Sequence, residues 1–296
     1  MEENRKRHEI INAPYNPVTG LGAVGERKKI SIKDSPIGDM YLPVELIKEN
    51  LFIRRLAKYG FKGYITRFIK EVEYSEEALN QLWIEFIKYR IIYDFEYWTY
   101  SFIFIKDKVS PKDIPFKLNR AQRRVLNKLE KLRKAGKPIK FILLKARQWG
   151  GSTLVQIYML WIMLVHRRNW NTVICGDVET QSRNVRAMIT KALNKYPSYL
   201  LGETVKFTPF EGSSKNKVIQ NTNCVVSIGS FQKPDTLRSG DISGAHLTEI
   251  GLWRATPGKK PEDLIQSISG SIYDTAYTIL GLESTAKGVG NFFHRT

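Results

Sequence analysis

The feature that most constrains the fold of this 296-residue chain is an apolar run, Ile139 to Leu144, followed by a short glycine-bearing loop and an apolar helical stretch. That helix is expected from about Ser152 to Val165. Further strand-like runs follow at Thr172–Cys175, Cys224–Ile228, Ala245–Thr248 and Tyr277–Leu282, with a helical stretch at about Glu179–Lys195. Strands that alternate with helices predict an α/β fold with a mostly parallel, doubly wound sheet.

The region before this alternation has a different pattern. Residues 1–30 combine charge with Asn, Pro and Gly and show no periodicity, which predicts a flexible arm. Residues 31–110 carry apolar side chains every three or four positions, which predicts a small α-helical N-terminal subdomain. Within the α/β domain, assigned to residues 111–296, one amphipathic helix is expected before Gly136 and Pro138.

The charge of the chain indicates a polyanionic partner. The formal net charge is +18, and residues 101–150 hold fifteen Lys or Arg against three acidic residues, a local excess of +12. Such a field attracts nucleic acid, although a solvated basic helix face would give the same count. The longest apolar runs are well below the roughly 20 residues of a membrane-spanning helix, so no membrane association is expected.

The loop after the first strand reads Lys145-Ala-Arg-Gln-Trp-Gly-Gly-Ser-Thr153. Adjacent glycines let a backbone wrap closely around phosphate, the N–H groups at a helix start face an anion, and a Ser or Thr hydroxyl can ligate Mg²⁺. The common G-x-x-x-x-G-K-[ST] pattern is not met, because Gly151 stands where lysine is expected. The loop alone therefore leaves an ordinary strand-to-helix turn open.

The same nine residues resemble the deviant Walker A motif of bacteriophage large terminase subunits, in which the lysine lies at the start of the loop. The resemblance makes Lys145 the phosphate-contacting lysine and Arg147 a second cation, without deciding which carries more weight. It makes Ser152 the Mg²⁺ ligand, with Thr153 as the alternative. The nucleotide-binding set it implies is Gln122, Lys145, Arg147, Gln148, Trp149, Gly150, Gly151, Ser152 and Thr153.

Two further segments resemble motifs that flank this loop in the same family. Phe116-Lys-Leu-Asn-Arg-Ala-Gln122 is similar to the adenine-recognition motif, with the Gln122 amide reading the adenine edge. A solvent-facing helix position for Gln122 is the alternative. Ala245-His-Leu-Thr-Glu249 occupies the Walker B position, which makes Glu249 the carboxylate that orients the attacking water. Here Thr248 replaces the usual aspartate, so Mg²⁺ would depend more on Ser152 and water.

The third motif follows the last strand, at Leu282-Glu-Ser-Thr-Ala-Lys-Gly288. Ser284 and Thr285 fall where the coupling motif of terminases and related helicases lies. Before the Walker B strand, Thr236-Leu-Arg-Ser-Gly240 resembles the family's Arg-Gly turn, and Arg238 could contact DNA or a neighbouring subunit's nucleotide, or be an ordinary turn arginine.

Together the three motifs imply an ASCE-type P-loop NTPase that uses ATP and Mg²⁺. The resemblance implies the ATPase motor domain of a viral terminase that moves double-stranded DNA into a procapsid, in the host cytoplasm. Its implied partners are double-stranded DNA, the portal protein, the small terminase subunit and further copies of the chain in a ring. A helicase-like ATPase and a non-enzymatic basic DNA-binding protein are the alternatives.

No nuclease activity is expected from this chain. Large terminases usually carry a metal-dependent nuclease domain after the ATPase domain. The coupling motif here ends near Gly288, and no acidic residue follows Glu283 to gather around paired metal ions.

Overall fold

The computed structural model describes residues 14–69, 74–107, 109–234 and 241–296, in two compact units. The first unit comprises Met1–Asn127 with Pro197–Glu203, and the second Lys128–Tyr196 with Thr204–Thr296. The division falls within a helix, and it groups residues 111–127 with the N-terminal part. The sequence pattern assigns those residues to the α/β domain. Within the described residues, every helix is too short or too polar to cross a lipid bilayer.

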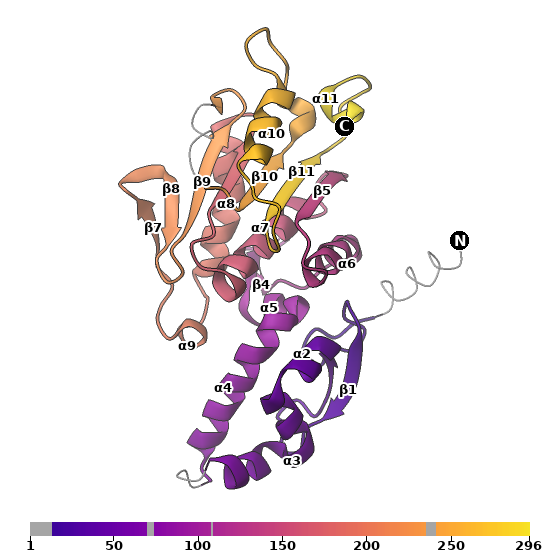
Figure 1. Cartoon of the computed structure of the whole chain (residues 1–296), viewed down its shortest axis with the longest axis vertical. Coiled ribbons are helices and arrows are strands. Elements are labelled where there is room, and N and C mark those ends of the chain that lie inside the picture. Colours follow the sequence, from indigo (N-terminus) through magenta and orange to yellow (C-terminus); the bar gives the residue numbers. More distant parts are fainter. Residues whose placement is uncertain (1–13, 70–73, 108, 235–240) are drawn as a thin grey trace, which may run out of the picture. The chain divides into compact units, whose positions relative to one another are not determined.

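The first unit is mainly helical (Figure 1). Its helices are α2 (Val44–Glu49), α3 (Leu51–Phe68), α4 (Glu76–Tyr93), α5 (Phe95–Phe102), the start of α6 (Arg120–Lys134) and α9 (Ser198–Leu201). It also holds two short antiparallel pairs, β1 (Arg27–Ser31) with β2 (Asp39–Pro43) and β3 (Phe104–Lys106) with β4 (Asp113–Pro115). The N-terminal helical subdomain is therefore confirmed, with strands that the helical periodicity did not indicate.

Polar side chains set the starts of the long helices in this unit. Asn50 accepts a hydrogen bond from the Ile53 N–H at the start of α3, Ser75 from Ala78 at α4, and Asp94 from Tyr97 at α5. Each cap satisfies a backbone donor that the helix itself cannot pair.

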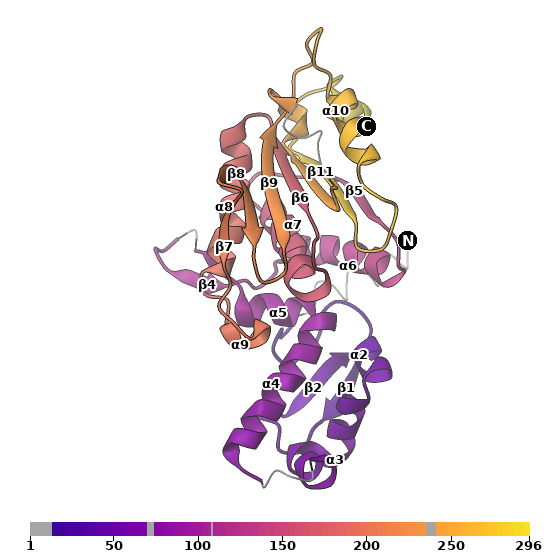
Figure 2. The same ribbon diagram turned by 60° about the vertical axis from the view of Figure 1, so that its left-hand side comes forward.

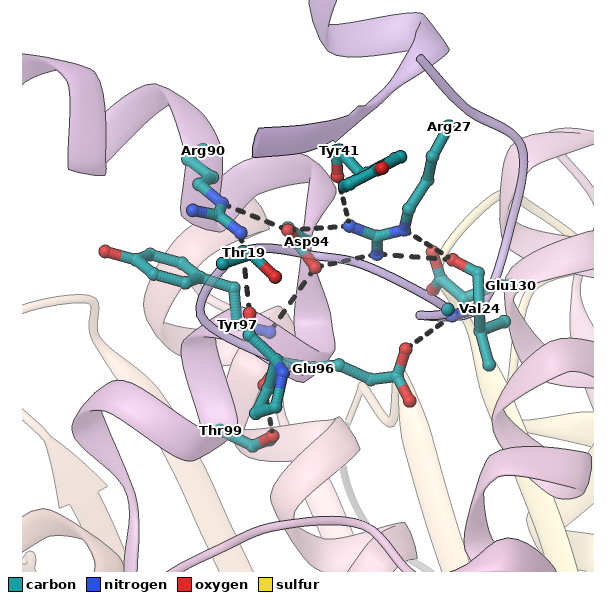
Figure 3. A network of polar contacts seen from close by, with 12 residues as sticks. Thr19, Val24, Arg27, Tyr41, Arg90, Asp94, Glu96, Tyr97, Thr99 and Glu130 are labelled. Atoms are coloured by element: carbon teal, nitrogen blue, oxygen red, sulfur yellow. Dashed lines mark hydrogen bonds and ion pairs between the residues drawn. The ribbon is translucent and has the colours of Figure 1, made fainter. Parts of the chain in front are cut away.

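A buried charge network surrounds the α4–α5 junction (Figure 3). The Asp94 carboxylate pairs with Arg27, N–O 2.8 Å, and with Arg90, N–O 3.1 Å. Burial alone would raise the pKa of Asp94, but the two guanidinium groups outweigh it and lower that pKa. Nearby, Glu96 pairs with Arg123 and accepts the Val24 N–H, so the network ties residues before β1 to the helices.

The second unit is built on a seven-stranded sheet with the order β5-β11-β10-β6-β9-β8-β7. Its strands are β5 (Ile139–Leu144), β6 (Thr172–Gly176), β7 (Phe207–Phe210), β8 (Ser213–Ile219), β9 (Cys224–Ser230), β10 (Gly244–Thr248) and β11 (Ile279–Ser284). The first five in the order are parallel, and β8 and β7 add an antiparallel edge. The mostly parallel sheet is therefore confirmed.

Helices cover both faces of this sheet (Figures 1 and 2). They are α7 (Gly151–Trp161), continued by the π-helical turn η1 (Ile162–His166), α8 (Glu179–Leu193), α10 (Pro261–Gly270) and α11 (Phe292–Arg295); the 3₁₀ turn η3 (Ile250–Leu252) follows β10. Ala245 and Leu247 of β10 join an apolar cluster with Leu264 and Ile268 of α10. On the other face, His246 contacts Gln156 of α7. Successive side chains of β10 point to opposite faces of the sheet, so Ala245 and Leu247 pack with α10 while His246 faces α7.

Candidate nucleotide site

The three predicted motifs of the second unit lie at the carboxyl-terminal ends of its parallel strands. Because β5, β11 and β10 are parallel neighbours, their carboxyl ends meet there, with Leu144 in register with Ser284 and Glu283 in register with Thr248. The strand that ends in the third motif is inserted between the strands that carry the first two. Ligands of open α/β sheets bind at the carboxyl ends of the strands.

The loop between β5 and α7 has the backbone shape of a phosphate cradle. Gln148 and Gly150 take positive φ values of 61° and 84°, and α7 begins at Gly151 without a cap from any described side chain. A Cβ on Gly151 would lie 2.8 Å from the Trp149 ring and 3.1 Å from Lys145 Cδ. A larger residue would displace the Trp149 or Lys145 side chain at the helix start, where backbone N–H groups and the helix dipole favour an anion.

Lys145 lies at the centre of the site. Its side chain is 7% exposed, and Nζ lies 2.8 Å from Glu249 Oε1 and 3.9 Å from Glu283 Oε1. Its backbone N–H donates to the Ser284 carbonyl at 2.9 Å, which anchors the residue to β11. The ammonium group is thus held between two carboxylates at the mouth of the loop.

Glu249 follows β10 directly and leaves the strand in a left-handed conformation, φ 55°. That conformation costs a non-glycine residue about 1–2 kcal/mol, and residues held so are concentrated at functional sites. The carboxylate also accepts hydrogen bonds from Thr285, at 3.2 Å from Oγ1 and 3.4 Å from the backbone N–H. Its side chain is 26% exposed, so water can reach it.

Ser284 and Thr285 connect the third motif to the turn after β10. The Ser284 hydroxyl accepts the Gly251 N–H at 2.9 Å and donates to the Thr285 carbonyl at 2.9 Å. A Cβ on Gly251 would lie 2.8 Å from that hydroxyl. Ser284 therefore fastens the end of β11 to the turn that follows Glu249.

Glu283 is a site residue that the sequence reasoning did not single out. It is fully buried, and its Oε1 accepts hydrogen bonds from the Ser152 hydroxyl and, at 2.9 Å, from Thr248. His246 Nε2 lies 3.1 Å away without the alignment of a hydrogen bond. Burial would raise the pKa of Glu283, but His246, Lys145 and the Ser152 hydroxyl outweigh it and lower that pKa to about 2. The carboxylate is therefore ionised at neutral pH.

The remaining predicted residues lie as follows. Arg147 is exposed on the loop, and the Thr153 hydroxyl lies 3.6 Å from Met188 Sδ. Gln122 belongs to the first compact unit and is buried, not solvent-facing; it accepts the Asn119 N–H at 2.9 Å while Asn119 accepts the Gln122 N–H at 3.0 Å. This reciprocal pair caps the start of α6. Arg238 lies outside the described residues.

The residues present fit a magnesium ion bound together with phosphates. Among the described residues, no group of three His, Cys, Asp or Glu side chains is placed to hold a metal alone. Mg²⁺ at phosphate sites keeps several waters and needs only one or two protein oxygens. Ser152 supplies one such oxygen, and Glu283 Oε2 is a buried oxygen without a hydrogen-bond partner among the described residues.

The sheet order and the glycine loop between β5 and α7 define an ASCE-type P-loop fold, with the third-motif strand between the other two. A search of solved structures finds this fold in the HK97 bacteriophage large terminase, at a TM-score of 0.50 and 21% identity over 67% of this chain. The ATPase domain of the Thermus phage P74-26 large terminase also matches, at a TM-score of 0.38 and 14% identity over 55% of this chain and 67% of that domain.

The likeness to the HK97 protein confirms, at the level of the fold, the resemblance to phage large terminases. The chain spans 37% of the HK97 protein. No protein-family model matches the chain, and a search of the curated proteins found no match.

Proposed function

We propose that this chain is the ATP-hydrolysing motor domain of a viral terminase, which moves double-stranded DNA into a procapsid. The observation that carries the proposal is the position of Lys145, whose ammonium group lies at the mouth of a glycine loop, 2.8 Å from Glu249. Phosphoryl transfer needs mainly positioning and charge stabilisation, and these two residues supply a phosphate cation and a carboxylate for the attacking water.

The chain's own residues then divide the work. The backbone of Gly150 and Gly151 and the start of α7 hold the phosphates, and Lys145 and Arg147 offset their charge. When bound, Mg²⁺ neutralises charge on the phosphates, with the Ser152 hydroxyl as its protein ligand and Thr153 as the alternative. Glu249 orients water, and Gln122 is proposed to read the adenine edge.

Coupling to movement is proposed to pass through Ser284 and Thr285. In the described structure Glu249 is paired with Lys145 and also bonded to Thr285. A bound triphosphate would compete with Glu249 for the lysine, which would leave the carboxylate to water and to Thr285. The nucleotide state would thereby reach Thr285, at the end of β11, through its hydrogen bonds to Glu249.

The wider assignment rests on the terminase fold and on charge. We propose residues 111–296 as the ATPase domain, which acts in the host cytoplasm as a ring on the portal protein together with the small terminase subunit. A motor that grips DNA through phosphates needs basic residues but no sequence preference. The lack of nuclease activity in this chain remains a prediction, tested by incubation with plasmid and Mn²⁺.

Steady-state ATP hydrolysis with and without linear duplex DNA tests the proposal. A packaging motor should hydrolyse ATP, with stimulation by linear duplex. ATP-driven strand separation on a forked duplex would instead favour the helicase-like alternative. DNA binding without any ATP hydrolysis would favour a non-enzymatic DNA-binding protein and contradict the proposal.

A further inference from the structure

The last residue of β10 is not a carboxylate, although the common Walker B motif has one at this position. Thr248 stands there, directly before Glu249, and its hydroxyl carries no charge to offer a cation. On the neighbouring strand, Glu283 is the residue in register with Thr248, and the Thr248 hydroxyl donates to Glu283 Oε1 at 2.9 Å. A carboxylate is therefore present at this depth in the sheet, supplied by β11 instead of β10.

Burial of the Glu283 carboxylate is energetically unfavourable, and a purely structural contact would not require it. Its side chain is 0% exposed, and a buried charge loses several kcal/mol of hydration. Oε1 has the Ser152 and Thr248 hydroxyls as donors and the Lys145 ammonium 3.9 Å away. Oε2 is buried with no hydrogen-bond partner among the described residues. A buried anionic oxygen without a donor is rare unless water or an ion completes the site.

The hydrogen bond from Ser152 also sets where that hydroxyl can bind a cation. When the Ser152 proton points at Glu283, the lone pairs of Oγ point away from the carboxylate. Such a hydroxyl can keep its bond to Glu283 and at the same time ligate a metal. Carboxylates that hold metal ligands in this manner raise metal affinity, and their removal costs about 10- to 100-fold.

We propose that Glu283 is the positioning residue for Mg²⁺ in this protein and does the work that an aspartate at position 248 does in the common motif. It holds the Ser152 hydroxyl in its ligating orientation, and Oε2 accepts a hydrogen bond from a water of the ion. The inference rests on the proposed nucleotide site and deepens it.

The test is the Mg²⁺ dependence of ATP binding, read from a fluorescent ATP analogue titrated in EDTA and at increasing Mg²⁺. Glu283→Gln should raise the Mg²⁺ concentration for half-maximal binding at least about 10-fold. The analogue's affinity in EDTA should stay within about twofold, because phosphate contacts from Lys145 and the loop remain. Glu262→Gln, which removes an exposed carboxylate on α10, is the matched control and should leave the Mg²⁺ requirement unchanged.

An exchange of the two residues separates metal positioning from a structural role. Thr248→Asp combined with Glu283→Thr returns a carboxylate to β10 and should restore most of the Mg²⁺ affinity lost in Glu283→Gln. If Glu283 only fastens the loop, Glu283→Gln will weaken binding equally in EDTA and Mg²⁺ and the exchange will not rescue it, which overturns the proposal.

Three other outcomes are also decisive. If Glu283→Gln does not fold, the exchange variant decides alone, and a folded exchange variant with a Mg²⁺ requirement at least about 10-fold above wild type contradicts the proposal. If the wild-type protein does not bind the analogue under any condition, the nucleotide site itself is wrong. Wild-type binding with an unchanged Mg²⁺ requirement in Glu283→Gln refutes only the role of Glu283.

Discussion

Lys145 and Glu249 neutralise each other in the structure, with 2.8 Å between Nζ and Oε1. Lys145 is proposed to bind phosphate and Glu249 to orient the attacking water. Neither side chain can do so while the two are paired with each other. A triphosphate carries more negative charge than one carboxylate and should draw the lysine toward the loop. We therefore propose that the ion pair links occupation of the loop to release of Glu249.

Lys145→Ala should lower the affinity for Mg·ATP about 10- to 100-fold, because a charge-assisted hydrogen bond in a partly dehydrated site contributes about 1.5–3 kcal/mol. Arg147→Ala is the comparison, since Arg147 is exposed and should contribute less. Titration with a fluorescent ATP analogue measures both. Wild-type affinity in Lys145→Ala would show that the lysine does not contact phosphate.

Some residues of the site could be predicted from single sequence motifs, and others could not. Lys145, Ser152, Glu249 and Thr285 stand in recognisable segments, and the structure brings them together. Glu283 was missed because its meaning depends on β11 lying beside β10, in register with Thr248, and a sequence does not state strand order. The Asn119-x-x-Gln122 spacing is also the pattern of a reciprocal helix cap, which the structure contains. The contact of Gln122 with adenine stays a prediction.

At the scale of elements, the start of α7 is a closely packed segment of the site. Gly151→Ala would place a methyl group 2.8 Å from the Trp149 ring and 3.1 Å from Lys145 Cδ, so the Trp149 or Lys145 side chain must move. We expect ATP affinity to fall at least about 10-fold with little loss of overall fold. Gly270→Ala, at the end of α10 with no atom within 4 Å, is the matched control and should bind as wild type. Unchanged ATP affinity in both variants would show that the loop accommodates a methyl group at position 151.

The charge network at the α4–α5 junction predicts a large loss of stability. Asp94→Asn leaves the buried Arg27 and Arg90 without their counter-ion, and the free energy of unfolding should fall by about 3–5 kcal/mol. Asp39→Asn removes an exposed pair with Lys29 and should change little. Chemical denaturation at neutral pH measures both, and equal effects would contradict the assignment.

The same network predicts a dependence on pH. The pKa of Asp94 is lower in the folded protein than the value of about 3.9 in an unfolded chain. Its stabilisation is therefore complete above about pH 4 and is lost as pH falls toward the folded pKa. The difference in unfolding free energy between wild type and Asp94→Asn should shrink below about pH 4.

The sequence predicted the apolar strands of the sheet. β6 and β10 are buried along their whole length and β9 largely so, and burial on both faces makes such runs visible without alternation. β5 was recognised from its apolar composition alone, because it is an edge strand in which Ile142 and Leu144 are exposed. The β7–β8 hairpin was missed because its strands, FTPF and SSKNKVI, are short and partly polar at the sheet edge. The strand order that places β11 between β5 and β10 depends on packing over long sequence separations.

At the scale of the whole molecule, not all of the basic charge is available to a partner. Of the fifteen basic residues in 101–150, Arg123 is buried against Glu96, Arg133 against Glu130, and Lys145 lies between two carboxylates. Several of the others, including Lys128, Lys131, Lys134 and Lys137, are exposed. The count from the sequence therefore overstates the charge that can meet phosphate.

DNA binding should nevertheless be strongly dependent on salt and indifferent to sequence. If about four phosphates are contacted, the affinity for duplex DNA should fall on the order of 100-fold between about 50 and 200 mM salt. Fluorescence anisotropy with two unrelated duplexes measures both properties. Binding that survives high salt or strongly prefers one duplex would argue against a motor that grips the DNA backbone.

The central claim is that the site formed by the glycine loop, Lys145 and Glu249 hydrolyses ATP. The most direct measurement is phosphate release by the wild-type chain and by Glu249→Gln in the presence of linear duplex DNA, with ATP binding measured on the same samples. The account predicts that the variant binds ATP at least as tightly as the wild type and releases phosphate at least about 100-fold more slowly, because the carboxylate that orients water is gone. Equal rates of phosphate release in the two proteins would contradict it.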